Sequence, residues 1–201
     1  MKNKLLLIML TLGLLPATLY AGADDNEIWL NQSGTGLVLN FTQKGYGNKV
    51  GLDDFSGTSA DMVLTGASNT FTLIQYGDSN KLYGPMIADS ATLNLTFTGN
   101  SNVMDWNIGQ NSADNINMLS AVTGDSNTWN IDIGANASAE YLNYDLVVSG
   151  SSNIFTTVVD SDNAVWNWTV TGASNDINTN QSDATDNSIT CLLYTSPSPR
   201  D

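Results

Sequence analysis

The sequence predicts an all-β fold, a β-solenoid built from strand–turn–strand coils of roughly 22 residues. Three observations lead to this fold class: a turn tetrapeptide that recurs along the chain, alternation of apolar and polar residues on both sides of each copy, and the regular spacing of the copies. A repeat of this length is typical of solenoids, in which each unit buries its apolar face only by stacking on its neighbours.

The turn motif is Gly-x-Ser-Asn. Gly reaches positive φ without steric cost, and Ser and Asn bond back to nearby backbone, so the tetrapeptide is suited to a tight turn. Six copies end at Asn69, Asn80, Asn102, Asn127, Asn153 and Asn175, and a looser copy ends at Asn48. Successive Asn residues are 21, 11, 22, 25, 26 and 22 positions apart, so an 11-residue half-unit is usually doubled into one coil. We expect five of these Asn residues to stack along one edge of the solenoid, with neighbouring coils about 4.8 Å apart: Asn69, Asn102, Asn127, Asn153 and Asn175.

The segments that flank each turn alternate with a period of two. The apolar positions around one turn, for example, are Leu93, Leu95, Phe97, Met104, Trp106 and Ile108. This period predicts strands with one buried face, whereas a helix would place apolar residues three and four apart. An antiparallel β-sandwich also alternates, but the same tetrapeptide at the same point of each unit favours stacking. The same phase predicts that Trp29 is exposed and that the core holds Trp106, Trp129, Trp166 and Trp168.

Opposite the tight turns, we expect loops at 51–60, 83–90, 109–115 and 134–143, where the segments differ in length and sequence. Insertions confined to one face of a repeat protein often mark its binding face. Loops also tolerate drift in length, and the sequence leaves both interpretations open.

The two ends of the chain differ from its middle. Residues 1–23 combine Lys2 and Lys4, an apolar run and a closing Ala21-Gly22-Ala23, which predicts a secretory signal peptide too short to span a membrane. Residues 191–201 hold the only Cys, the only Arg and two of the four Pro, and they resemble a translated sequencing adapter. We therefore expect a non-native tail there, with a flexible natural tail as the alternative, and one extracellular repeat domain at 24–190.

The composition of residues 24–190 excludes several functions. Their 19 Asp and Glu against three Lys, a balance of −16, repel nucleic acid and anionic lipid. The chain has no His, and residues 24–190 have no Arg or Cys. Nucleophile–His catalysis and zinc sites therefore have no residues to form them. We expect no enzyme, no catalytic residue, no nucleic-acid partner and no membrane span.

Carboxylates leave two other functions open. Asp53 and Asp54, or Asp160 and Asp162, are the nearest candidates for glycoside hydrolysis, although Asp also favours turns and solvated faces. We expect no cofactor; clustered loop carboxylates would suit calcium, but the chain has no G-G-x-G-x-D calcium repeat. Ice binding and plain β-propensity both explain the outward threonine pairs Thr70/Thr72, Thr96/Thr98 and Thr169/Thr171.

The repeat resembles the curlin repeat, the unit of bacterial curli fibres. The pattern of that family places Gln-x-Gly-x-x-Asn at its centre, with another polar residue six positions before the Gln. Residues 69–80 match all of it, 43–48 match its centre and 26–34 match its first part, with Gln75, Gln43 and Gln32 at the Gln position. The later coils have a hydrophobic interior instead, with Phe97, Val122, Val148 and Val170 at that position.

The resemblance implies a secreted, amyloid-like structural or adhesive protein of the cell surface or biofilm, which stacks on itself or on related fibre subunits. Side-chain ladders along the stack are expected to include Gln32, Gln43, Asn48, Asn69, Gln75, Asn80, Asn102, Asn127, Asn153 and Asn175. The alternative is a monomeric solenoid that binds calcium, a surface glycan or ice.

Overall fold

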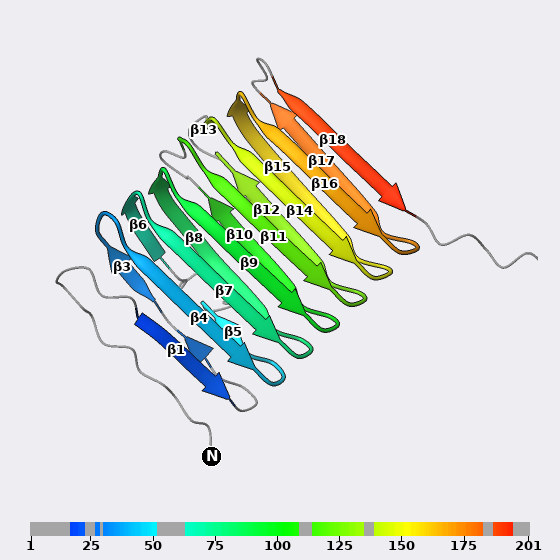
Figure 1. Cartoon of the computed structure of the whole chain (residues 1–201), viewed down its shortest axis with the longest axis horizontal. Coiled ribbons are helices and arrows are strands. Elements are labelled where there is room, and N and C mark those ends of the chain that lie inside the picture. Colours follow the sequence, from blue (N-terminus) through cyan, green and yellow to red (C-terminus); the bar gives the residue numbers. More distant parts are fainter. Residues whose placement is uncertain are drawn as a thin grey trace, which may run out of the picture.

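The structure is a computed structural model, and it describes residues 17–22, 27–28, 30–51, 63–108, 114–134, 139–182 and 187–194. In these ranges the chain is all β, without a helix, and its parallel strands stack as a β-solenoid, as the sequence predicts (Figure 1). None of these residues belongs to a helix long and apolar enough to cross a membrane.

One sheet, which we call the regular sheet, forms the front layer in Figure 1. Its eight strands pair in parallel with the next strand of the same sheet along the chain. The strands are β1 (Ala17–Gly22), β4 (Val38–Lys44), β7 (Thr70–Tyr76), β9 (Thr92–Thr98), β11 (Asn117–Thr123), β14 (Asn143–Ser149), β16 (Val165–Thr171) and β18 (Ser188–Tyr194).

The second sheet, which we call the variable sheet, has ten strands of unequal length. They are β2 (Glu27–Ile28), β3 (Asn31–Ser33), β5 (Lys49–Val50), β6 (Val63–Ala67), β8 (Lys81–Asp89), β10 (Val103–Ile108), β12 (Thr128–Ile133), β13 (Ala139–Glu140), β15 (Ile154–Asp162) and β17 (Asp176–Ser182). The loop expected at 83–90 is wrong: this segment continues β8 as far as Asp89, because β8 pairs with β6 after it has paired with β5.

Each coil therefore has two halves, and only one of them varies in length. The half that contains the regular-sheet strand and the tight corner spans 11 residues in each of 38–48, 70–80, 92–102, 117–127, 143–153 and 165–175. The return half, which contains the variable sheet, spans 21, 11, 14, 15 and 11 residues in 49–69, 81–91, 103–116, 128–142 and 154–164. All the length differences between these coils lie in the return half.

The core lies between the two sheets and follows the period of two. Strand β9 alternates buried and part-exposed side chains along its whole length, and the other central strands do the same. Trp106, Trp129 and Trp166 are fully buried and Trp168 is 3% exposed, as predicted. Trp29 lies outside the described residues.

One strand lies outside the expected repeat domain, 24–190, and another crosses its C-terminal boundary. β1 lies within residues 1–23, the predicted signal peptide, and pairs in parallel with β4. β18 begins before Thr190 and continues through Cys191 to Tyr194, in the segment expected to be a non-native tail.

Candidate functional site

The tight corner is a turn that places two residues of the repeat motif, the Gly and the Ser, at positive φ. From Gly77 to Gly172, the motif Gly of each corner that follows a regular-sheet strand has φ between +119° and +149°, and the motif Ser has φ between +56° and +59°. A Cβ on Gly99 would lie 2.1 Å from the carbonyl oxygen of Gly77 in the preceding coil. Coils approach at this corner through bare backbone, which is the physical reason for the glycine.

A ladder of buried asparagines runs along this corner. The Oδ1 atom of each ladder Asn accepts a hydrogen bond from the backbone N–H of the ladder Asn in the preceding coil. The N–O distances along the series Asn48, Asn80, Asn102, Asn127, Asn153 and Asn175 are 3.0, 2.9, 2.8, 2.9 and 3.0 Å. Side-chain amides add bonds, such as the 3.0 Å contact from Asn127 Nδ2 to Asn153 Oδ1. The ladder therefore bonds to the backbone of the neighbouring coil at every step.

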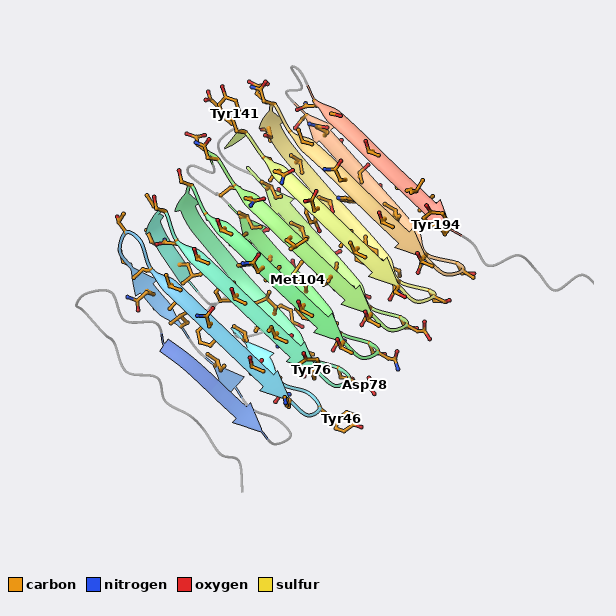
Figure 2. All side chains as sticks on the ribbon, in the orientation of Figure 1. Tyr46, Tyr76, Asp78, Met104, Tyr141 and Tyr194 are labelled. Atoms are coloured by element: carbon orange, nitrogen blue, oxygen red, sulfur yellow. The ribbon has the colours of Figure 1, made fainter. Side chains whose placement is uncertain are left out.

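A second, exposed ladder occupies the residue after the motif Gly, and it runs in the opposite sense. The backbone N–H of Asn100 donates to Asp78 Oδ1, that of Asp125 to Asn100 Oδ1 at 2.7 Å, and that of Ser151 to Asp125 Oδ1. Tyr46 and Asp78 project from successive tight corners (Figure 2). Because Asn100 separates the two carboxylates, Asp78 and Asp125 lie two coils apart, about 9.6 Å, which reduces like-charge repulsion within the stack.

Asn69 does not belong to the buried ladder, so the expectation that it stacks with Asn102 is wrong. Its motif precedes β7, which pairs with β9 so that Thr70 is opposite Thr92, and this register places Asn69 at the opposite corner. There its Oδ1 accepts the backbone N–H of Leu37 at 2.9 Å. The step from Asn69 to Asn80 is only 11 residues, half a coil, and this spacing already indicated that Asn69 lies at the corner opposite Asn80. Sequence reasoning missed Asn187, whose Oδ1 accepts the N–H of Ala164 at 2.6 Å in the same manner.

The glutamines form one short contact rather than a long ladder. Gln75 Nε2 donates to Gln43 Oε1 at 2.6 Å, and both side chains are fully buried. The register continues this row through Phe97, Val122, Val148 and Val170, so the polar contact ends after two coils. Gln32 lies on the variable sheet in β3, opposite Leu64, and is not in this row.

The carboxylates do not assemble a metal centre in the part of the chain that the structure describes, where no three acidic, Cys or His side chains gather closely enough. Asp53 and Asp54 lie outside the described residues. Burial and, to a lesser extent, the nearby Asp160 raise the pKa of Asp132 above its ordinary value. From the sequence, Asp160 and Asp162 were grouped as a candidate carboxylate pair, whereas the structure brings Asp160 close to Asp132.

The fold and the two ladders define the class of this protein, a parallel β-solenoid with backbone-capping Asn ladders. Known family models, curated proteins and solved structures give no match to the chain.

Proposed function

We propose that this protein is a secreted, curli-like structural or adhesive protein of the cell surface, a fibre subunit or nucleator that assembles by stacking its coils on those of other copies. The observation that carries the proposal is the sameness of the coil-to-coil contact. Parallel pairing and the buried Asn bond repeat from Asn48 to Asn175, so a contact between two copies can reuse the contact within one copy.

The N-terminal end of the solenoid supplies an edge for such stacking. β1 pairs with one edge of β4, and β7 pairs with the other. β1 belongs to the predicted signal peptide, and removal of residues 1–23 during export would leave one edge of β4 unpaired. An unpaired edge is a template for a strand of another chain. Phe41 and Gln43 of β4, both buried in the structure, would lie at the newly opened end.

The two ends of the solenoid differ in charge, although both are acidic on balance. The only cations of residues 24–190 are Lys44, Lys49 and Lys81, which lie in β4, β5 and β8 at the N-terminal end. The opposite end carries exposed Asp176 in β17. Two unlike ends make a heterologous contact, which leads to open-ended filaments when it does not close into a ring.

The test follows thioflavin fluorescence and electron microscopy of residues 24–190 at low and high salt, with and without calcium. We expect fibres that form faster at high salt, because salt screens the repulsion between acidic copies. Calcium should not be required. Residues 17–190, which keep β1, are the matched control and should form fibres more slowly.

Two results would redirect the proposal. A chain of residues 24–190 that stays monomeric at high concentration in both salts is not a fibre subunit. If that monomer also gains several degrees of melting temperature with calcium, the function is that of the monomeric binding module.

A further inference from the structure

The outer surface of the regular sheet has a composition unlike the rest of the molecule. We call the outward side chains of β4, β7, β9, β11, β14, β16 and β18 the flat face. The register aligns them in four rows across the strands. One row consists of Lys44, Tyr76, Thr98, Thr123, Ser149, Thr171 and Tyr194, and Tyr76 and Tyr194 lie at the same ends of their strands (Figure 2).

The flat face is electrically neutral, although residues 24–190 carry a balance of −16. Its only charged side chains are Lys44 and Asp145. The Nζ atom of Lys44 lies 5.7 Å from the ring centroid of Tyr76, and Asp145 Oδ1 accepts a 2.9 Å hydrogen bond from Asn167 Nδ2. The outer surface of the variable sheet, in contrast, carries Asp132 and Asp176 among its carboxylates.

The flat face also gathers exposed apolar side chains. Leu119 and Val147 near its middle are 48% and 47% exposed. The other large apolar side chains exposed on it are Val38, Tyr76, Val165, Leu192 and Tyr194. The register places Leu119, Ala121 and Val147 side by side, and Thr, Asn and Ser side chains separate the other exposed apolar residues. The apolar cluster of the flat face therefore lies near its middle, where a contact would exclude water best.

The shape and size of the flat face suit a sheet-on-sheet contact. Its strands run side by side in nearly the same direction (Figure 1), so that the surface does not twist away from a flat partner. Seven strands about 4.8 Å apart and about 23 Å long cover about 750 Å². A standard protein–protein interface buries about 800 Å² on each partner.

We propose that the flat face docks onto the flat face of a second copy of this chain, as a two-fold pair of sheets packed about 10 Å apart. Acidic copies repel one another through their other surfaces, and this is the face on which two copies meet without net charge. Leu119, Ala121 and Val147 then exclude water near the middle of the contact. The lateral contact is independent of end-to-end stacking and adds a second direction of association.

The rows argue against an ice lattice as the occupant. An ordered water layer would be matched by the same hydroxyl side chain on successive strands. The row that contains Thr96 and Thr169 also contains Ile74, Ala121 and Val147, which present hydrocarbon instead.

Sedimentation velocity of the full chain over a range of concentrations tests the proposal. We expect a reversible dimer that forms before any larger species, since the two-fold contact is closed and β1 of the full chain covers the edge of β4 that end-to-end stacking would use. Val147→Lys places two like charges in the contact and should weaken dimerisation by more than about tenfold. Leu119→Lys is a second variant with the same expected effect, and denaturation midpoints establish that each variant is folded.

Val158→Lys is the matched control. Val158 is 38% exposed on the outer surface of the variable sheet, so the substitution adds the same charge to the same residue type outside the flat face. It should leave the dimer unchanged. A wild-type chain that is monomeric at every concentration overturns the proposal, as does equal weakening by Val147→Lys and Val158→Lys. Open-ended growth without a dimer plateau supports end-to-end stacking and also overturns the lateral contact.

Discussion

The two halves of each coil close on side chains of different chemistry, and only one of the halves varies in length. At the tight corner the closing residue is a buried Asn that bonds to the adjacent coil. At the opposite corner it is in most coils an apolar residue: Ala91, Ile116, Leu142 or Ala164. Hydrogen bonds are directional, whereas apolar burial is not. The tight half, with a directional bond at every closing Asn, keeps 11 residues throughout, whereas the return half varies in length whether it closes with an apolar residue or with Asn69.

The largest expected difference in stability is between one-residue insertions in the two halves of a coil. A Ser inserted between Leu95 and Thr96 in β9 shifts the following side chains to the wrong face, because the strand period is two. We expect loss of cooperative unfolding by circular dichroism. A Ser inserted between positions 110 and 111, in the return half, should cost less than about 1 kcal/mol. Equal losses would mean that the two halves do not differ in tolerance.

The second prediction compares glycines at the two corners. Gly99→Ala brings a Cβ to 2.1 Å from the Gly77 oxygen and should lower the free energy of unfolding by more than about 4 kcal/mol. At the opposite corner the equivalent Gly66 is just as crowded, with a Cβ 1.8 Å from the Gly34 oxygen. A Cβ on Gly36, which occupies the motif-Ser position, would instead meet no described heavy atom within 4 Å, although its φ is +70°. Gly36→Ala should therefore cost only about 1 kcal/mol. Urea denaturation measures both, and a mild Gly99→Ala would show that the corners can separate.

The third prediction concerns the shared core. Trp129 packs between Phe97 and Phe155, with ring centroids 5.1 and 5.7 Å away, and Trp129→Ala should cost about 3–5 kcal/mol. Its indole N–H has no hydrogen-bond partner among the described residues. Trp129→Phe should therefore cost much less, about 1 kcal/mol. A Phe variant as unstable as the Ala variant would point to an acceptor for the indole.

The fourth prediction tests the buried ladder directly. Asn127→Ala removes the acceptor of the Asn102 N–H and should cost about 1–3 kcal/mol, because a buried donor is left without a partner. Asn143→Ala removes an exposed side-chain bond to Asn117 and should cost less than about 0.5 kcal/mol. Similar losses for the two variants would mean that a bond of the buried ladder stabilises the stack no more than an exposed side-chain bond does.

The smallest effect is expected on the outer surface of the variable sheet. The pKa of Asp132 is raised in the folded chain, so its ionised form costs stability at neutral pH. Asp132→Asn should raise the urea midpoint there, and the gain should shrink as the pH falls through the folded pKa and the wild-type carboxyl becomes protonated. Asp176→Asn, which removes one exposed charge, controls for net charge. A gain that persists in acid would exclude ionisation as the cause.

Local sequence patterns predicted the strands and turns of one coil, but they did not predict which strands pair with one another between coils. The period of two around Phe97 and Trp106 identified the strands and the buried face, because side-chain alternation is a property of the strand itself. The corner of Asn69 and the sheet of Gln32 depend on which half-coil pairs with which, and the repeated motif does not encode that choice. The continuation of β8 to Asp89 depends on β6, a partner that lies earlier in the chain.

The flat face was missed for a similar reason. Leu119 and Val147 are apolar residues at outward positions that are mostly polar, and they lie far apart in the sequence. Only the strand register brings them onto neighbouring strands of one surface. The pairing of Asp132 with Asp160 also arises across strands rather than along one.

The opposite senses of the two ladders give every coil two chemically distinct surfaces. Toward the C-terminus a coil presents the N–H of its buried Asn and the side-chain oxygen of the residue after the motif Gly, as Asn102 and Asn100 do. Toward the N-terminus it presents the complementary Oδ1 and N–H. Two coils that met by equivalent surfaces would oppose donor to donor and acceptor to acceptor. A stack of such coils is therefore polar, with two non-equivalent ends, and in a fibre of the proposed kind the two ends would add copies at different rates.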